Sequence, residues 1–275
     1  MQAAPSPSRG HTFLALPPIP LARIGGATIV AAILFFLILP TLLVIPMSVG
    51  TSSFIQFPPK GLTFRWYLEY FGDPGWRAAT WFSLKIALAT TVAATVIGTL
   101  ASIAFVRGRL PGASLVQALS LSPIVVPHIV IAVALYLVFA PIGLTGNFTG
   151  FLVAHTMLSV PYVVITVTAA LRGFDPQIEL AALNCGATRP RAFLTVVLPN
   201  IIPGVAAGAV FAFLNSFDEA TVAFFISGND GKTITRKLFE DIDFNLTPVI
   251  AAVSTVMLLV SLVLMATIEG IRRRK

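Results

Sequence analysis

Charged residues are scarce in this sequence: they make up 11% of its 275 residues, whereas hydrophobic residues make up 56%. Soluble globular domains carry about 25% charged residues, so this composition excludes an ordinary water-soluble fold. Long apolar runs occupy most of the chain, and the segments between them are too short for a large domain outside a membrane. The composition therefore predicts an all-α integral membrane protein.

Residues that could form reactive sites are also few. The only cysteine, Cys185, excludes an intrachain disulfide and a CxxC metal site, and we expect it to pack as a small apolar residue. Neither HExxH nor GxSxG occurs, and His11, His128 and His155 lack the spacing of metal ligands. The sequence thus indicates no catalytic site and no metal site. We expect His128 and His155 to be hydrogen-bonded interior residues, with a position on a polar pathway as the alternative.

The chain also lacks a nucleotide site. Gly231, Lys232 and Thr233 look like the end of a phosphate-binding loop, but that motif requires a glycine where Ile226 stands. We therefore expect this segment to be a solvated loop and the chain itself to bind neither ATP nor Mg²⁺.

A helix that crosses a bilayer needs roughly 20 apolar residues. Six stretches qualify: Ala27–Val49, Ile86–Val106, Leu115–Ala140, Phe151–Leu171, Pro203–Ile226 and Pro248–Ile268. The fifth is the least uniform, because Asp218 and Glu219 interrupt it. We expect residues 1–26 to be a mobile tail without a cleavable signal and residues 27–275 to form one membrane domain.

Several of these stretches contain prolines, namely Pro40, Pro46, Pro123, Pro127 and Pro161. Proline removes a backbone donor, so these positions predict kinks or broken helices. The signal is weak, because proline is common in membrane helices generally.

The distribution of basic residues indicates the orientation. If the N-terminus is cytosolic, 11 Lys and Arg residues face the cytosol, six face outside, and Lys85 borders the second span. This agrees with the positive-inside rule and places both termini and residues 173–203 in the cytosol. The net charge of +7 is then a signal of topology, and it does not indicate nucleic-acid binding, for which no folded basic surface is available. We expect the basic C-terminal end to contact anionic lipid.

Residues 173–203 predict a helix-turn-helix between the fourth and fifth spans. Asp175 can cap a helix that starts at Pro176, and Gly186 can end it in the left-handed conformation. Thr188 can cap the next helix, and Pro199 and Pro203 would mark the entry into the fifth span. One face of the first helix carries small or apolar residues at helical spacing: Ile178, Ala181, Ala182 and Cys185.

The spacing in this segment resembles the EAA loop of ABC-importer permeases. That pattern is EAA, three residues, Gly, nine residues, Ile, any residue and Leu-Pro, and the residues that match it are Ala181, Ala182, Gly186, Val196, Leu198 and Pro199. One departure is that Leu180 precedes the alanine pair and the carboxylate comes one residue earlier, at Glu179. The resemblance implies that an ATPase subunit docks on Glu179, Ala181, Ala182, Gly186, Leu198 and Pro199.

Other stretches are similar to permeases of the spermidine/putrescine type, including Ser216–Gly228 and Ala251–Thr255. In the first outer loop this similarity implies a short helix against the membrane, with Trp66, Tyr67, Tyr70, Trp76 and Trp81 suited to an interfacial belt. The resemblance further implies a multi-pass subunit of a bacterial inner membrane that forms a translocation pathway and is not an enzyme. Its implied partners are a second, different permease, two cytosolic ATPase subunits that bind ATP and Mg²⁺, and a periplasmic or extracellular solute-binding protein.

Asp218 and Glu219 are the candidate contacts for the transported solute. A carboxylate in a span costs a few kcal/mol unless it faces protein or water, and a cationic amine would balance its charge. Asn215 and Ser216 are further polar candidates on the same stretch. Nearby aromatic rings could provide cation–π contacts: Phe211, Phe213, Phe217, Phe224 and Phe225. The alternative is that both carboxylates lie at the outer end of the span, in water or bonded to a neighbouring helix.

Three other functions stay open on the sequence. The chain could serve an importer of another small solute, such as an amino acid derivative, because these residues do not fix the solute. An ion-coupled secondary transporter would leave the helix-turn-helix unexplained. A structural subunit without a pathway would explain why most of the spans carry so little charge.

Overall fold

A computed structural model of the chain describes residues 21–108, 111–228, 231–244 and 246–273. In chain order the helices are α1 (Leu21–Met47), α2 (Arg65–Gly72), α3 (Pro74–Arg107), α4 (Ala113–Val125), α5 (His128–Phe139), α6 (Phe148–Gly173), α7 (Pro176–Asn184), α8 (Arg189–Ala192), the π-helical turn η1 (Phe193–Val197), α9 (Leu198–Phe217), α10 (Thr221–Ile226), α11 (Ile234–Phe244) and α12 (Val249–Arg273). The described residues contain no strand, which confirms the all-α prediction.

The chain divides into two units, residues 1–43 and 44–275. The first unit contains most of α1. This helix begins at Leu21, whereas hydropathy predicted that the first span begins at Ala27. Residues 1–20 of the predicted tail lie outside the described residues. All other helices, and the sites considered below, belong to the second unit.

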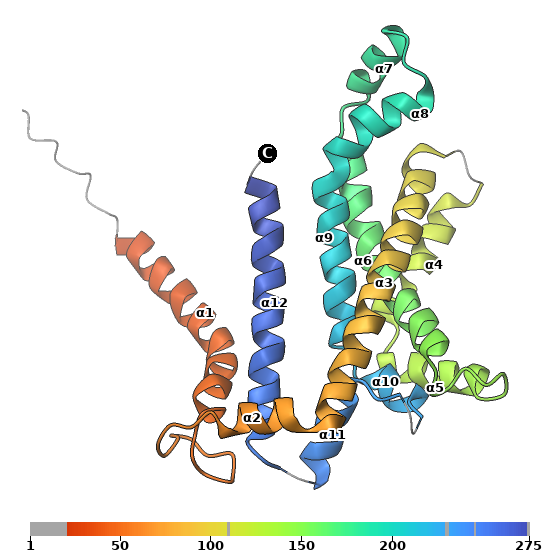
Figure 1. Ribbon diagram of the computed structural model, residues 1–275. Coiled ribbons are helices and arrows are strands. Elements are labelled where there is room, and N and C mark those ends of the chain that lie inside the picture. The colour runs from red at the N-terminus through yellow and green to blue at the C-terminus, as the bar shows by residue number, and fades with distance from the viewer. Residues whose placement is uncertain (1–20, 109–110, 229–230, 245, 274–275) are drawn as a thin grey trace, which may run out of the picture. The chain divides into compact units, whose positions relative to one another are not determined.

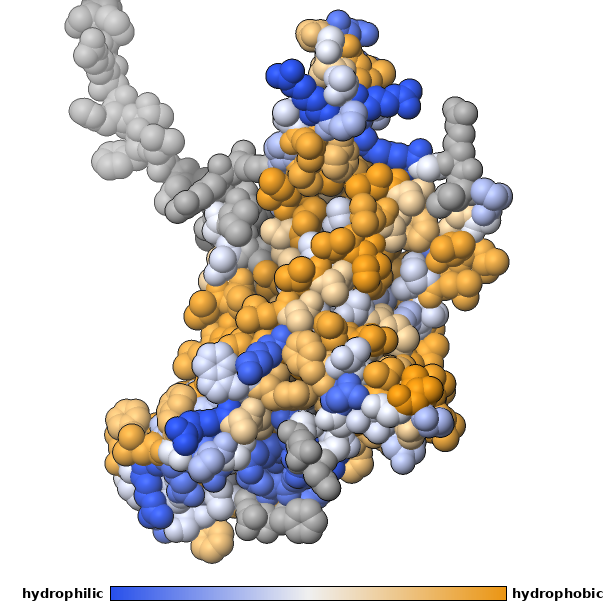
Figure 2. Space-filling view, turned by 45° about the vertical axis from the view of Figure 1, so that its right-hand side comes forward, coloured by the Kyte–Doolittle hydropathy of each residue, from blue (hydrophilic) through white to orange (hydrophobic). Residues whose placement is uncertain are grey.

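Five segments of the described chain are long and apolar enough to cross a membrane: Gly25–Met47, Pro74–Arg107, Phe148–Gly173, Arg189–Phe217 and Val249–Thr267. The α4–α5 pair would be a sixth if its two bent halves count as one span. Figure 2 shows a broad hydrophobic band with hydrophilic residues gathered at its two ends, one of them the end with α7 and α8. The multi-pass character of the chain is thus clear, while six crossings remain a prediction.

The third predicted span is not a single helix. Between α4 and α5 the chain bends by 103° at Val126 and Pro127. Steric contact with proline disfavours the helical conformation of the preceding residue, and both residues are extended, with ψ of 132° and 130°. Two extended residues redirect the chain, so a continuous apolar run becomes two short helices.

Helices α3, α6 and α9 pack against one another at the centre of the second unit (Figure 1). Val163 of α6 lies between Gly98 of α3 and Gly208 of α9: a Cβ on Gly98 would lie 2.6 Å from the Val163 Cβ, and one on Gly208 would lie 3.0 Å from the Val163 Cα. Small residues let membrane helices approach closely where no hydrophobic force drives them together. The two glycines therefore fix the spacing of the three helices.

The short helix predicted in the first outer loop is present as α2. Trp76 and Trp81 belong to α3, and three of the five aromatic residues predicted for the membrane interface are buried. Trp66, Tyr70 and Trp76 are buried in a cluster with α9 and α12 residues. The indole N–H of Trp66 donates to the Gly50 carbonyl over 2.7 Å, which satisfies its polar atom within the protein. The predicted belt is therefore wrong for these three rings, whereas Trp81 is 62% exposed.

Candidate functional site

Helix α9 ends at Phe217, so the fifth predicted span does not continue to Ile226 as one helix. The Asp218 N–H donates to the Leu214 carbonyl over 3.0 Å and closes the last turn of α9. The chain then changes direction before α10. Asp218 and Glu219 therefore do not lie within a continuous fifth span; both lie in the connection between α9 and α10. Ending the helix there places the two carboxylates where polar neighbours from other helices can reach them.

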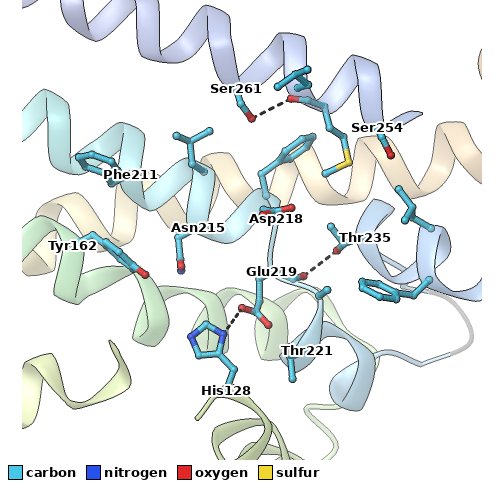
Figure 3. A pocket seen from close by; sticks show the side chains of 17 residues that line it. His128, Tyr162, Phe211, Asn215, Asp218, Glu219, Thr221, Thr235, Ser254 and Ser261 are labelled. Atoms are coloured by element: carbon cyan, nitrogen blue, oxygen red, sulfur yellow. Dashed lines mark hydrogen bonds and ion pairs between the residues drawn. The ribbon is translucent and has the colours of Figure 1, made fainter. Parts of the chain in front are cut away.

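A cavity of about 800 Å³ opens beside this connection. Figure 3 shows its polar lining, with His128 from α5, Tyr162 from α6, Asn215 from α9, and Asp218 and Glu219 after α9. The remaining lining is mainly apolar and comes from α9, α11 and α12, including Phe211, Phe217, Leu238, Phe239 and Met257. A few polar groups on apolar walls are typical of a small-molecule site.

Asp218 is exposed in this cavity, and its carboxylate makes no hydrogen bond or ion pair with any residue that the structure describes. Asn215, one turn earlier on α9, also lines the cavity, and its amide donates to the Ser159 hydroxyl over 3.2 Å. The structure thus places three of the four predicted pathway residues, Asn215, Asp218 and Glu219, on one hollow, with the Asp218 charge available to a ligand.

Glu219 also lines the cavity but is only 5% exposed and already bonded. One carboxylate oxygen accepts the Val222 N–H over 2.7 Å, and the other lies 3.1 Å from Nδ1 of His128. The Glu219 carbonyl accepts the Thr235 hydroxyl over 2.9 Å. Glu219 therefore joins α5, α10 and α11, which is the structural role that the sequence left open as an alternative.

Ser216, the fourth predicted pathway residue, faces away from the cavity. It is buried, and its hydroxyl lies 2.9 Å from Nδ1 of His155. His155 is thus a hydrogen-bonded interior residue as expected, whereas His128 reaches the cavity, the alternative considered for it. Of the five phenylalanines predicted near the pathway, Phe211 and Phe217 line the hollow, and Phe213 stacks on Phe217 in the core.

Sequence reasoning kept a pathway position for His128 only as an alternative, and it did not select Tyr162 as a cavity residue. His128 lies far from Glu219 along the chain, and the turn at Pro127 brings the two together. Tyr162 had no distinguishing signal within the long, mostly apolar stretch that forms α6. Only the packing of α6 beside α9 shows that its ring borders the same hollow as Asn215.

The predicted helix after residue 175 is present as α7, at the end of α9 opposite α10 (Figure 1). The Asp175 carboxylate accepts the Gln177 N–H over 2.9 Å, and Gly186 adopts a φ of +87°, both as expected. Cys185 is exposed, so the prediction that it packs inside is wrong. Ala181 is exposed and Ala182 half-buried, which leaves most of the small-residue face open.

The second half of the predicted helix-turn-helix differs from the expectation. Thr188 precedes α8, but its side chain makes no capping bond. Helices α8 and α9 are joined through η1 without a break, so Leu198 and Pro199 begin α9 and Pro203 lies inside it. The π-helical turn η1 lies just before Pro199, and such a wider turn accommodates the backbone hydrogen bond that the proline cannot donate. The prolines therefore do not interrupt the entry into the span.

Glu179 is bonded within the chain. Its carboxylate lies 2.8 Å from Nη1 of Arg107, the last residue of α3, and the Arg107 guanidinium also lies 5.9 Å from the centre of the Phe174 ring. This contact ties α7 to the end of α3. Both side chains remain partly exposed, so the pair is worth at most about 1 kcal/mol.

We expect reversal of either charge, by Arg107→Glu or Glu179→Arg, to weaken the attachment of α7 to α3 by up to about 1 kcal/mol, since that is the most a partly exposed ion pair contributes. The double reversal should restore the stability, because the two residues then form the same ion pair with their charges exchanged. Thermal unfolding of the detergent-solubilised protein measures the effect in each variant. Failure of the double reversal to recover the wild-type unfolding temperature would show that this ion pair does not hold α7 on α3.

Comparison with known proteins places the chain among membrane transport components. Residues 94–274 match the family described as binding-protein-dependent transport system inner membrane component. The chain is 30% identical over 256 residues to the spermidine/putrescine transport system permease protein PotC of Escherichia coli K12, covering 93% of this chain and 96% of that protein. It is 31% identical over 231 residues to the putrescine transport system permease protein PotI of the same strain, covering 81% of this chain and 82% of the relative.

Solved structures share the fold. A bacterial ABC transporter involved in the import of the acidic polysaccharide alginate has a chain that superposes with a TM-score of 0.70 at 14% identity, covering 98% of this chain and 99% of that one. An amino acid ABC transporter with histidines superposes with a TM-score of 0.57 at 18% identity, covering 78% of this chain and 100% of the other. At these identities the likeness concerns the fold alone.

Proposed function

Because the chain belongs to the binding-protein-dependent transport inner-membrane family and is an ABC-importer permease, a transport component and not an enzyme, we propose that it carries polyamines or related cationic amines. The observation that supports this solute is the unpaired Asp218 carboxylate on a cavity of about 800 Å³. Its relatives named for spermidine and putrescine transport point to the same chemistry.

The cavity suits a flexible cation with an apolar backbone. Asp218 offers a charge, Asn215 and Tyr162 offer polar atoms, and the rings of Phe211 and Phe239 offer walls for a methylene chain. A partly desolvated charge-assisted hydrogen bond contributes about 1.5–3 kcal/mol. A neutral solute would leave Asp218 without a counter-ion, which disfavours a sugar or a neutral amino acid derivative.

The partners of the chain follow from the same proposal. A second permease, different from this one, would complete the pathway, and a solute-binding protein would deliver the amine from outside the membrane. Two cytosolic ATPase subunits would bind ATP and Mg²⁺ and dock on residues Glu179, Ala181, Ala182 and Gly186, with Leu198 and Pro199 carrying the movement into α9. The open small-residue face of α7 supports this docking surface, and the direct passage of α8 into α9 gives it a mechanical path.

The proposed topology has six crossings, with the bent α4–α5 pair as one of them, and both termini in the cytosol. In this arrangement α7 and α8 face the cytosol. Asp218 lies at the far end of α9, about 30 Å away for 20 residues at about 1.5 Å each. ATP hydrolysis and solute contact would therefore act at opposite ends of one helix.

Cysteine labelling tests this orientation. The native exposed Cys185 is first replaced by serine. A membrane-impermeant thiol reagent should then label Lys60→Cys in intact cells but Arg189→Cys only after permeabilisation, because the two exposed positions would face opposite sides. Labelling of Arg189→Cys in intact cells would place α8 outside and remove the proposed ATPase docking surface.

A further inference from the structure

A second pocket, separate from the cavity at Asp218, lies between α3 and α11 and has a volume of about 550 Å³. Its lining includes three lysines, Lys85, Lys232 and Lys237, together with the single carboxylate of Glu240. No part of the solute pathway proposed above uses these residues. The transport pathway proposed above therefore does not explain why three lysines line this pocket.

The charges in this pocket leave a net positive site. Lys232 lies 2.9 Å from Glu240 and Lys237 lies 3.6 Å from Asp241. Burial alone would raise the pKa of Glu240, but hydrogen bonds and charges from Lys232 and Arg236 outweigh it and keep the pKa below its ordinary value, so Glu240 is ionised. Lys85 makes no hydrogen bond or ion pair with any described residue. An anion in the pocket could therefore bind the free ammonium of Lys85 and the ammonium groups of Lys232 and Lys237, which their ion pairs hold in place.

The depth of Lys85 in the membrane follows from the sequence of α3. The apolar stretch Ile86–Val106 separates Lys85 from Arg107 and is roughly 32 Å long at about 1.5 Å per residue. The hydrocarbon core of a bilayer is about 30 Å thick. If Arg107 lies at one interface, Lys85 lies at the other, and the exposed Trp81 one turn away has the position of an interfacial aromatic residue.

An exposed apolar stripe runs along α3 directly from Lys85 into the hydrocarbon layer. It consists of residues spaced by three and four positions, which share one helix face, and its members are Leu88, Val92 and Val96, each 53–66% exposed. The basic pocket lies at the level of the lipid headgroups, and the apolar stripe extends from it into the hydrocarbon layer. This arrangement fits an amphiphile whose phosphate would bind the lysines and whose acyl chains would lie along the stripe. Free phosphate would contact the lysines but not the apolar stripe, and an acidic protein surface would not bind the stripe either.

We propose that the pocket between α3 and α11 binds the phosphate headgroup of an anionic phospholipid, with its acyl chains along Leu88, Val92 and Val96. The leaflet is the one on the side away from α7. Bound there, the lipid would bridge the central helix α3 and the amphipathic α11, whose Thr235 is bonded to the Glu219 carbonyl. This site is independent of which solute the permease carries.

Native mass spectrometry of the purified, detergent-solubilised transporter tests the site with phosphatidylglycerol, using phosphatidylcholine as the zwitterionic comparison. We expect preferential retention of phosphatidylglycerol, weakened roughly fivefold for each lysine removed in Lys85→Gln and in Lys85→Gln/Lys232→Gln. Lys60→Gln, which removes the same charge from an exposed loop outside the pocket, should bind as the wild type does. Lys85→Arg keeps the charge and should retain the lipid even if a glutamine variant folds poorly.

Three results would overturn the proposal. Equal retention of the two lipids, or unchanged retention in a folded double variant, would remove the headgroup site. Displacement of phosphatidylglycerol by inorganic phosphate at the same concentration would identify a small-anion site. Loss of solute-binding-protein association in the double variant, with unchanged lipid binding, would assign the lysines to a protein contact.

Discussion

Asp218→Asn should lower polyamine uptake efficiency by tenfold to roughly 100-fold while the variant is expressed and inserted normally. The substitution keeps the size and hydrogen-bonding capacity of the side chain and removes only its charge. A charge-assisted contact of about 1.5–3 kcal/mol would be lost, and about 1.4 kcal/mol corresponds to tenfold. Because Asp218 has no partner among the described residues, its neutralisation should leave the fold intact. Uptake of radiolabelled spermidine at several concentrations measures the effect.

Two comparisons make this result specific. Asp243→Asn removes the same charge from an exposed position of α11 outside the cavity and should transport normally. Glu219→Gln should reduce uptake less than Asp218→Asn, because Glu219 is already bonded to His128 and Val222, and its main effect should be on stability. Undiminished uptake by a normally expressed Asp218→Asn/Glu219→Gln variant would leave the polyamine proposal without a residue that carries it.

Gly186→Val should abolish ATPase association and transport while sparing membrane insertion. Gly186 has a φ of +87°, and valine in this conformation is strained by about 1–2 kcal/mol. No atom considered in the described chain lies within 4 Å of a Cβ built at this position, so a steric effect must come from a partner. Co-purification of the ATPase and uptake in intact cells provide the two measurements.

Two control variants distinguish strain in the turn at Gly186 from a steric clash at the proposed docking surface. Gly112→Val introduces the same strain at another open glycine, with φ of +73°, and should keep ATPase association. Gly186→Asn tolerates the left-handed conformation but adds a side chain at the proposed interface, so we expect it to lose association as well. Normal association of Gly186→Asn would show that only the turn matters, and normal transport by Gly186→Val would contradict docking at this position altogether.

Local patterns were sufficient to predict α6, α7 and the part of α3 from Ile86 on, whereas residues 74–85 of α3 were expected in the outer loop. Apolar runs of membrane length predict α6 and the apolar part of α3, and the Asp175-Pro176 start with Gly186 at the end predicts α7. These features depend on residues near one another in the chain, where capping, periodicity and glycine conformation are decisive. The same reasoning identified Asp218 as unusual, because a carboxylate in an apolar run is costly wherever the helices lie.

The features that sequence reasoning missed depend on geometry between distant segments. Hydropathy runs without interruption through Val126 and Pro127, so it could not distinguish a kink from the 103° bend. That bend brings His128 to Glu219, and no local pattern links the two residues. The burial of Trp66 likewise follows from the packing of α2 on α12, and its aromatic character alone fits both a core and an interface.

Accumulation of spermidine in proteoliposomes tests the central claim most directly. The vesicles would contain this chain with its partner permease and ATPase subunits, supplied with the solute-binding protein and ATP on the appropriate sides. The account predicts accumulation that requires ATP hydrolysis, persists when ionophores remove ion gradients, and falls at least roughly tenfold in Asp218→Asn. Accumulation driven by an ion gradient without ATP, or no accumulation of any cationic amine by an intact complex, would contradict it.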